Sequence, residues 1–458
     1  MEVARSPHLP CVPVDANATD SNSATDVLDL WRQQKQIPAP FVWPNADARP
    51  SSMLELDVPV VDIGAALHSA AGMGRAAAQV AEACASHGFF QVTGHGVDPA
   101  LARAALDGAA DFFRLPLATK QGARRSPGTV EGYASAHADR FAAKLPWKET
   151  LSFSHNHDDV GARGNSHVVV DYFTSALGDD FKHLGEVYQE YCEAMEEASL
   201  AIMEVLGMSL GLGRGYYRDY FADGSSIMRC NYYPRCPEPD RTLGTGPHCD
   251  PSALTILLQD GDVDGLQVLV DGAWRFVRPK TGELVVNIGD TFMAVVAGGA
   301  CPPQRWVTPK ESVCRDECPS VAPACPHPPI CLCLCARQRS AQHSTDDSSA
   351  RLVMPAPALS NGRYKSCLHR AVVHREKERR SLAYFLAPRE DRVVRPPPSP
   401  APAPRLYPDF TWAELMRFTQ RHYRADARTL DAFARWLDPP TCSATPLSHG
   451  PAQAQGTV

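Results

Sequence analysis

Short segments rich in branched and aromatic residues, each bounded by glycine, proline or aspartate, follow one another from residue 226 onward. Several short strands at near-regular intervals predict an antiparallel β-sandwich or barrel, and this pattern is the strongest constraint on the fold. It stops near residue 293 and resumes near residue 364. The expected strands are residues 228–233, 254–259, 266–270, 274–277, 284–288, 364–373 and 380–387.

Helical patterns flank this β region on both sides. Before it we expect a strand, an alanine-rich helix, a second strand and two amphipathic helices, at residues 58–62, 74–86, 88–92, 101–114 and 180–206. After it, a proline-rich connector precedes closing helices at 412–423 and 429–436. The predicted fold class is mixed α+β. It has an N-terminal α/β region at 51–222, and the connector with its closing helices occupies 395–438.

Composition excludes several classes of protein. The chain has 458 residues, 44% hydrophobic, with a formal net charge of −7, so neither a nucleic-acid nor an anionic-membrane partner is expected. No basic segment precedes an apolar run at the N-terminus, and no run of apolar residues is long enough to span a bilayer. We therefore expect a cytoplasmic protein with reduced cysteines. Residues 1–50 are predicted to be a flexible arm with a short helix near 26–36, and residues 439–458 a disordered tail.

Residues 294–357 fit neither pattern. This segment of 64 residues holds 7 of the 15 cysteines and 10 of the 40 prolines, with no sustained period. Such a structureless stretch inside a compact domain is unusual, so it is either an insertion or a sign that the surrounding assignment is wrong. Cys331, Cys333 and Cys335 suggest a zinc site, but alternate spacing crowds the thiols and no fourth ligand is evident. We favour a segment that binds no metal.

His248 and Asp250 are separated by one residue. On a strand, side chains at i and i+2 point to the same face, so an imidazole and a carboxylate converge. They would be two of the three ligands of a 2-His-1-carboxylate triad, which holds Fe(II) with open coordination positions. The alternative is a polar turn on a surface loop.

A third ligand and an anion site follow downstream. His369 lies on a strand-like run and is the preferred third ligand, while His374, beside a charged turn, is the alternative. Arg379 and Ser381 again share a strand face. A guanidinium fork beside a hydroxyl forms a clamp suited to a carboxylate.

Taken together, these motifs resemble the plant Fe(II)- and 2-oxoglutarate-dependent dioxygenases, and among them the gibberellin 20-oxidases. The signs shared with the superfamily are Asn231-Tyr232-Tyr233-Pro234-x-Cys236, His248-x-Asp250, His369 and Arg379-x-Ser381. Those shared with the 20-oxidases are residues 132–135, 145–153, 243–251, 287–293 and 358–366. The resemblance covers about residues 40–293 and 358–437.

The resemblance implies a double-stranded β-helix, or jelly-roll, core at 223–293 and 358–394. It implies Fe(II) on His248, Asp250 and His369, 2-oxoglutarate as co-substrate, and ascorbate as reductant. Arg379, the candidate catalytic residue, would hold the far carboxylate of 2-oxoglutarate together with Ser381. Asn231 and Tyr233 are candidates for contact with the co-substrate, with core packing as their alternative.

The implied substrate is a twenty-carbon gibberellin, oxidised stepwise at carbon 20 to a nineteen-carbon lactone. Trp147, Lys148 and Arg140 are candidate substrate-binding residues, although a buried Trp147 beside a solvated Lys148 is equally compatible with the sequence. The expected partners are this small molecule, 2-oxoglutarate and dioxygen, bound by a monomer. A related dioxygenase acting on another gibberellin position or on a flavonoid is the alternative.

The chain departs from the family at one place. In the family, the block matching 287–293 runs directly into the block matching 358–366. Asp250 and His369 are 119 positions apart, and removing the 64 residues of 294–357 leaves 55, close to the family interval. We interpret 294–357 as a retained intron or a mis-spliced exon. Because a slip of one residue would turn His369 away, an active enzyme with an added loop and an inactive or unstable isoform both remain possible.

Overall fold

The computed structural model describes residues 36–43, 54–137, 144–155, 167–261, 263–296, 364–397, 407–422 and 429–437. All of them belong to the compact unit formed by residues 1–300 and 358–458. None of the described helices is both long and apolar enough to cross a membrane.

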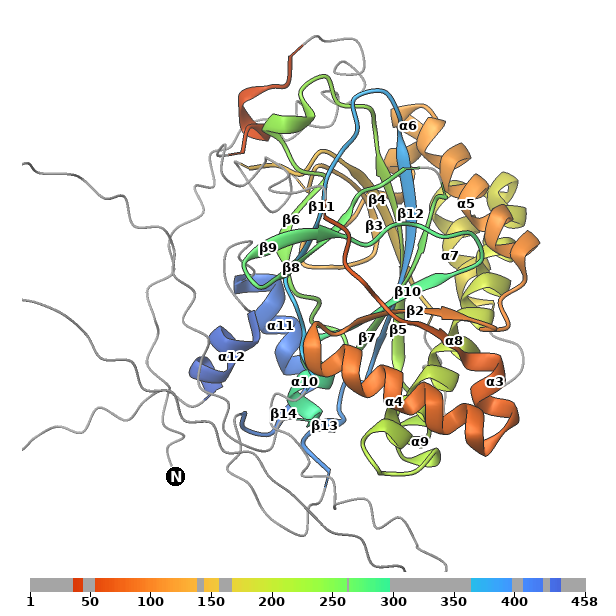
Figure 1. Ribbon diagram of the computed structural model, residues 1–458. Helices are drawn as coiled ribbons and strands as arrows, with labels where there is room; N and C mark the ends of the chain where they lie inside the picture. Colours follow the sequence, from red (N-terminus) through yellow and green to blue (C-terminus); the bar gives the residue numbers. More distant parts are fainter. Residues whose placement is uncertain are drawn as a thin grey trace, which may run out of the picture. The chain divides into compact units, whose positions relative to one another are not determined.

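Two sheets organise this unit (Figure 1). The major sheet has the strand order β1-β2-β10-β7-β12-β5-β4-β3, and the minor sheet has the order β6-β11-β8-β9. The strands of the major sheet are β1 (Val60–Asp62), β2 (Phe89–Thr93), β3 (Gly132–Ser135), β4 (Glu149–Ser154), β5 (Ser225–Tyr233), β7 (Leu254–Gln259), β10 (Leu284–Ile288) and β12 (Arg379–Ala387). Those of the minor sheet are β6 (Thr245–His248), β8 (Leu266–Val270), β9 (Ala273–Phe276) and β11 (His369–Ala371).

The core is a jelly roll, in which β10, β7, β12 and β5 of the major sheet are matched by the four strands of the minor sheet. All pairs within this core are antiparallel. The segments on the two sides of 294–357 meet in both sheets, because β12 lies between β5 and β7 and β11 lies between β6 and β8. The fold therefore rejoins in register after the interruption.

Helices cover one side of the major sheet (Figure 1). Asp98 caps α5 by accepting hydrogen bonds from the backbone nitrogens of Ala100 and Leu101, and Pro99 begins that helix. Two closing helices follow the core and pack together through Phe418 and Phe433. The helices are α3 (Ile63–His68), α4 (Ala70–Ser86), α5 (Pro99–Arg114), α6 (Leu117–Lys120), α7 (Val168–Leu177), α8 (Lys182–Ser209), α9 (Gly215–Phe221), α10 (Asp290–Val296), α11 (Trp412–His422) and α12 (Thr429–Leu437). Short elements complete the unit: η1 (Ala39–Phe41), η2 (Gln121–Ala123), η3 (Asp179–Phe181), η4 (Pro239–Arg241), β13 (Val393–Val394) and β14 (Phe410–Thr411).

Several predicted strands coincide with observed ones, including 254–259, 266–270 and 284–288. The strand expected at 364–373 is instead only three residues long, His369–Ala371. The residues before it have other partners: the Lys365 backbone nitrogen donates to the Cys84 carbonyl, and the Tyr364 and Ser209 hydroxyls share a hydrogen bond. This stretch therefore crosses to the helical layer before β11 begins.

The strands of the N-terminal region belong to the major sheet. β1 and β2 extend one edge of the major sheet, and β3 and β4, which were not predicted, extend the other. All four residues of β3 are buried, so this strand has no alternation of apolar and polar residues that a pattern could reveal.

Two predicted boundaries are wrong. Phe41 and Trp43 are buried, and the Trp43 indole donates to the Leu145 carbonyl, so the arm predicted to be flexible over 1–50 is docked at this point. Ala294, the first residue of the predicted insert, is buried within α10. The rest of 294–357 after Val296, the cysteine cluster, the helix near 26–36 and the tail at 439–458 lie outside the described residues, apart from Gln36.

Candidate metal centre and co-substrate pocket

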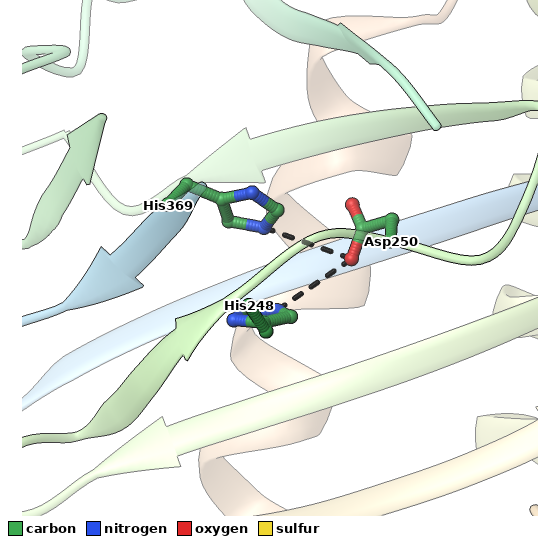
Figure 2. Close-up of side chains that lie close together, drawn as sticks. All are labelled: His248, Asp250 and His369. Atoms are coloured by element: carbon green, nitrogen blue, oxygen red, sulfur yellow. Dashed lines mark ion pairs between the residues drawn. The ribbon is translucent and has the colours of Figure 1, made fainter. Parts of the chain in front are cut away.

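Three potential metal ligands meet between the two sheets: His248 at the end of β6, Asp250 just after it, and His369 at the start of β11 (Figure 2). β6 and β11 pair so that the two histidines are directly opposite each other. Asp250 Oδ1 is 3.5 Å from His248 Nε2 and 3.6 Å from His369 Nε2. Two ligand atoms that are each about 2.1 Å from one ion, with an angle of about 90° to 120° between them, lie about 3.0 to 3.6 Å apart. The spacing fits one metal ion.

The imidazole orientations are set by backbone carbonyls. His248 Nδ1 lies 2.9 Å from the Gly246 carbonyl, and His369 Nδ1 lies 3.2 Å from the Cys367 carbonyl. A carbonyl can only accept, so each Nδ1 carries the proton and each Nε2 presents its lone pair to the centre. Burial, followed by the charge of His369, lowers the pKa of His248 to about 3. A neutral imidazole is the form that binds a metal ion.

The carboxylate is oriented by the major sheet. Asp250 Oδ2 accepts from the Thr255 hydroxyl at 2.7 Å and from the Asn287 amide at 2.9 Å, which leaves Oδ1 directed at the histidines. Burial raises the pKa of Asp250, but His369, His248 and these two hydrogen bonds together outweigh it, so the net shift is downward. Asp250 is therefore an anionic ligand. Neither Thr255 nor Asn287 was predicted, because only the pairing of β7 with β10 brings them together.

The predicted co-substrate residues form a block on the major sheet. Arg379 pairs with Tyr233, and Ser381 pairs with Asn231, across β12 and β5. The Arg379 guanidinium lies 5.1 Å from the Tyr233 ring centroid. Asn231 Nδ2 donates to the Ser381 hydroxyl at 3.4 Å. The spacing of two residues thus predicted a shared face correctly.

Arg379 has the features expected of a buried anion receptor. It is 2% exposed, and its Nη2 donates to Gln259 Oε1 at 2.9 Å, whereas its Nε has no hydrogen-bond partner among the described residues. A Cβ at Gly265 would collide with the arginine side chain, so glycine provides its space. Burial lowers the pKa of Arg379. A carboxylate at Nε would satisfy the open donor and balance the buried charge.

The predicted substrate residues differ in their surroundings. Trp147 is 1% exposed, its indole donates to the Pro234 carbonyl at 3.2 Å, and Phe41 packs edge-on against it, so its contacts are those of a core residue. Lys148 is also buried rather than solvated. Arg140 lies outside the described residues. His374 accepts from the backbone nitrogens of Glu376 and Lys377 in an exposed turn, which leaves His369 as the third ligand.

A jelly roll with a 2-His-1-carboxylate cluster beside a buried arginine defines the class of the protein: an Fe(II)-dependent oxygenase that uses 2-oxoglutarate. Comparisons with models of known protein families agree with this class. The 2OG-Fe(II) oxygenase superfamily matches residues 224–315 and 337–388, and the N-terminal region of the non-haem dioxygenases in morphine synthesis matches 58–169. The break between 315 and 337 falls inside the predicted insert.

Proteins of similar sequence place the chain in one family within this class. Gibberellin 20 oxidase 2 of Oryza sativa subsp. indica is 60% identical over 442 residues, which cover 96% of this chain and 95% of the relative. Gibberellin 20 oxidase 2 of Arabidopsis thaliana is 45% identical and covers 89% of each chain. A crystal structure of JOX2 with 2OG, Fe and JA matches with a TM-score of 0.62 and 27% identity, covering 89% of this chain and 97% of that one. The chain belongs to the 2OG-Fe(II) oxygenase superfamily, in the family of the gibberellin 20-oxidases.

Proposed function

We propose that this protein oxidises carbon 20 of a twenty-carbon gibberellin precursor stepwise to a nineteen-carbon gibberellin, with 2-oxoglutarate converted to succinate. The observation that carries the proposal is the convergence of His248, Asp250 and His369 beside the buried Arg379, in a chain 60% identical to a gibberellin 20 oxidase. When bound, Fe(II) and 2-oxoglutarate would allow dioxygen to oxidise a carbon–hydrogen bond of the substrate.

The chain's own residues would hold and orient these groups. His248, Asp250 and His369 would bind Fe(II) on one side and leave the other side for co-substrate and dioxygen. Arg379 Nε and the Ser381 hydroxyl would bind the far carboxylate of 2-oxoglutarate, and the Tyr233 ring beneath the guanidinium holds its plane. Asn231 donates a hydrogen bond to the Ser381 hydroxyl and would thereby help to orient that hydroxyl toward the co-substrate.

The test is a reaction of the purified full chain with Fe(II), 2-oxoglutarate, ascorbate and a twenty-carbon gibberellin. We expect products oxidised at carbon 20, identified by mass spectrometry, with succinate formed in step. Products oxidised at another carbon, or turnover of a flavonoid only, would assign the chain to the alternative substrate class. We also expect ascorbate to sustain turnover. We expect the protein to be a monomer in solution and to be located in the cytoplasm.

A specific observation bears on the inactive-isoform alternative. The register of β11, with His369 opposite His248 and Val268, is the arrangement a working metal centre needs. We therefore propose that the chain is active despite the predicted insert. Deleting 294–357 puts Ala358 in the place of Ala294, so the shortened chain keeps the same residue at the join. Equal turnover by both forms supports this proposal, and turnover by the shortened form alone overturns it.

A further inference from the structure

The inner face of the major sheet carries a second group of cations besides Arg379. Along β5, Arg229 lies two residues before Asn231 and four before Tyr233, so all three side chains point to one face. Ser152 on β4 pairs with Arg229, and Thr150 pairs with Asn231. Lys148, two residues before Thr150, continues this row toward Tyr233.

The other face of β4 has a structural role. Glu149 accepts from the Lys120 ammonium and the Tyr133 hydroxyl, both at 2.6 Å, and all three residues are buried. Leu151 and Phe153 on the same face belong to the main hydrophobic core. The alternation of β4 thus separates a packed face from a face that carries the polar residues Thr150 and Ser152.

Arg229 is held in one orientation. Its Nε donates to the Ser152 hydroxyl at 2.9 Å, and its guanidinium lies 5.3 Å from the centroid of the Phe385 ring. These two contacts fix the plane of the guanidinium. A planar fork fixed in this way is suited to bidentate binding of a carboxylate.

Lys148 is a second cation directed at the same space. It is 5% exposed, and it continues the row of Ser152 and Thr150 on β4. Burial, then the charges of Arg229 and Arg125, hold the pKa of Lys148 well below its usual range, with Asp250 acting in the opposite direction. Buried like charges cost free energy that an entering anion offsets.

We propose that Arg229, with Lys148 across the same space, forms the subsite that binds a carboxylate of the organic substrate. The inference rests on the proposed function, because gibberellins are carboxylic acids, and it assigns Arg229, which no motif singled out. Arg379 is paired with Tyr233, four residues along β5 from Arg229, a distance of roughly 13 Å along a strand. Substrate and 2-oxoglutarate would therefore have separate anion sites and would not compete.

The test compares a twenty-carbon gibberellin acid with its methyl ester. Binding to the full chain loaded with Fe(II) and 2-oxoglutarate is measured without oxygen by titration calorimetry, and KM and kcat are measured in air. For Arg229→Gln we expect acid binding about 10- to 100-fold weaker, as for loss of a charge-assisted hydrogen bond, with ester binding nearly unchanged. KM for the acid should rise more than kcat falls, and KM for 2-oxoglutarate should stay constant. Arg229→Lys should restore only part of the affinity.

Arg417→Gln, which changes an exposed arginine on α11, is the matched control and should bind the acid as the wild type does. Should Arg229→Gln fail to fold, Ser152→Ala removes only the hydroxyl that holds Nε and should weaken acid binding several-fold. Unchanged acid binding in these variants, or equal binding of acid and ester by the wild type, overturns the inference. Acid binding that depends on Arg229 without product at carbon 20 would instead overturn the proposed function alone.

Discussion

The two sheets place functional residues by different physical means. On the major sheet, β5 and β12 pair along nine residues each, so the position of every inward side chain follows from one register. On the minor sheet, β6 has four residues and β11 three, and their ligands are oriented by bonds to the Gly246 and Cys367 carbonyls. The long strands position their side chains by strand pairing, whereas the short strands need additional hydrogen bonds to orient theirs.

The largest effect is expected at the metal carboxylate. Asp250→Asn removes the charged ligand atom while keeping the shape of the side chain, so Fe(II) affinity and turnover should fall far more than the roughly 10–100-fold that loss of an outer-shell partner costs. Asn287→Ala removes only one donor to Asp250, so its loss of Fe(II) affinity and turnover should lie within that range. Anaerobic Fe(II) titration measures both. Equal losses in the two variants would mean that the sheet contact, rather than the ligand, controls the site.

This contrast also explains what could be predicted from the sequence. The strands at 254–259 and 284–288 were correct because each is bounded by turn residues, and Arg379 with Ser381 followed from their spacing. His369 was preferred because it lies on a strand-like run, whereas His374 lies beside a charged turn. Thr255 and Asn287 are visible only once β7 and β10 pair. The alternation of Arg229 with Asn231 and Tyr233 is visible in the sequence. Its meaning becomes clear only when β4 pairs with β5 and places Ser152 opposite Arg229.

The next effect concerns the outer face of β4. Glu149→Gln leaves the Lys120 charge buried without its anion, and breaking such a pair costs about 3–5 kcal/mol of folding free energy. Urea denaturation measures the loss. Glu186→Gln breaks the exposed pair with Lys182 and should cost no more than about 0.5 kcal/mol. If both variants lost the same small amount, the buried pair would not be what holds β4 in place.

A smaller effect is expected at the co-substrate clamp. Arg379→Lys keeps the charge but loses the planar fork, so KM for 2-oxoglutarate should rise about 10- to 100-fold. Arg380→Lys changes the neighbouring side chain, which lies on the opposite face of β12 and pairs with Asp260, and should leave that KM within about two-fold. Decarboxylation of 2-oxoglutarate without substrate provides the readout. A similar KM for both variants would show that register alone does not select Arg379 as the clamp.

The smallest effect tests whether the short strands of the minor sheet need support from the N-terminal arm. Trp43 packs on Gly246, whose carbonyl orients His248, and its indole donates to the Leu145 carbonyl at 3.2 Å. Trp43→Phe keeps a ring but loses this hydrogen bond, so stability should fall by about 1–2 kcal/mol and Fe(II) affinity by several-fold. Trp436→Phe, at a half-exposed site on α12, should change neither. A loss of stability with unchanged Fe(II) affinity would show that β6 orients His248 without help from the arm, because the bond from Nδ1 to Gly246 would then suffice.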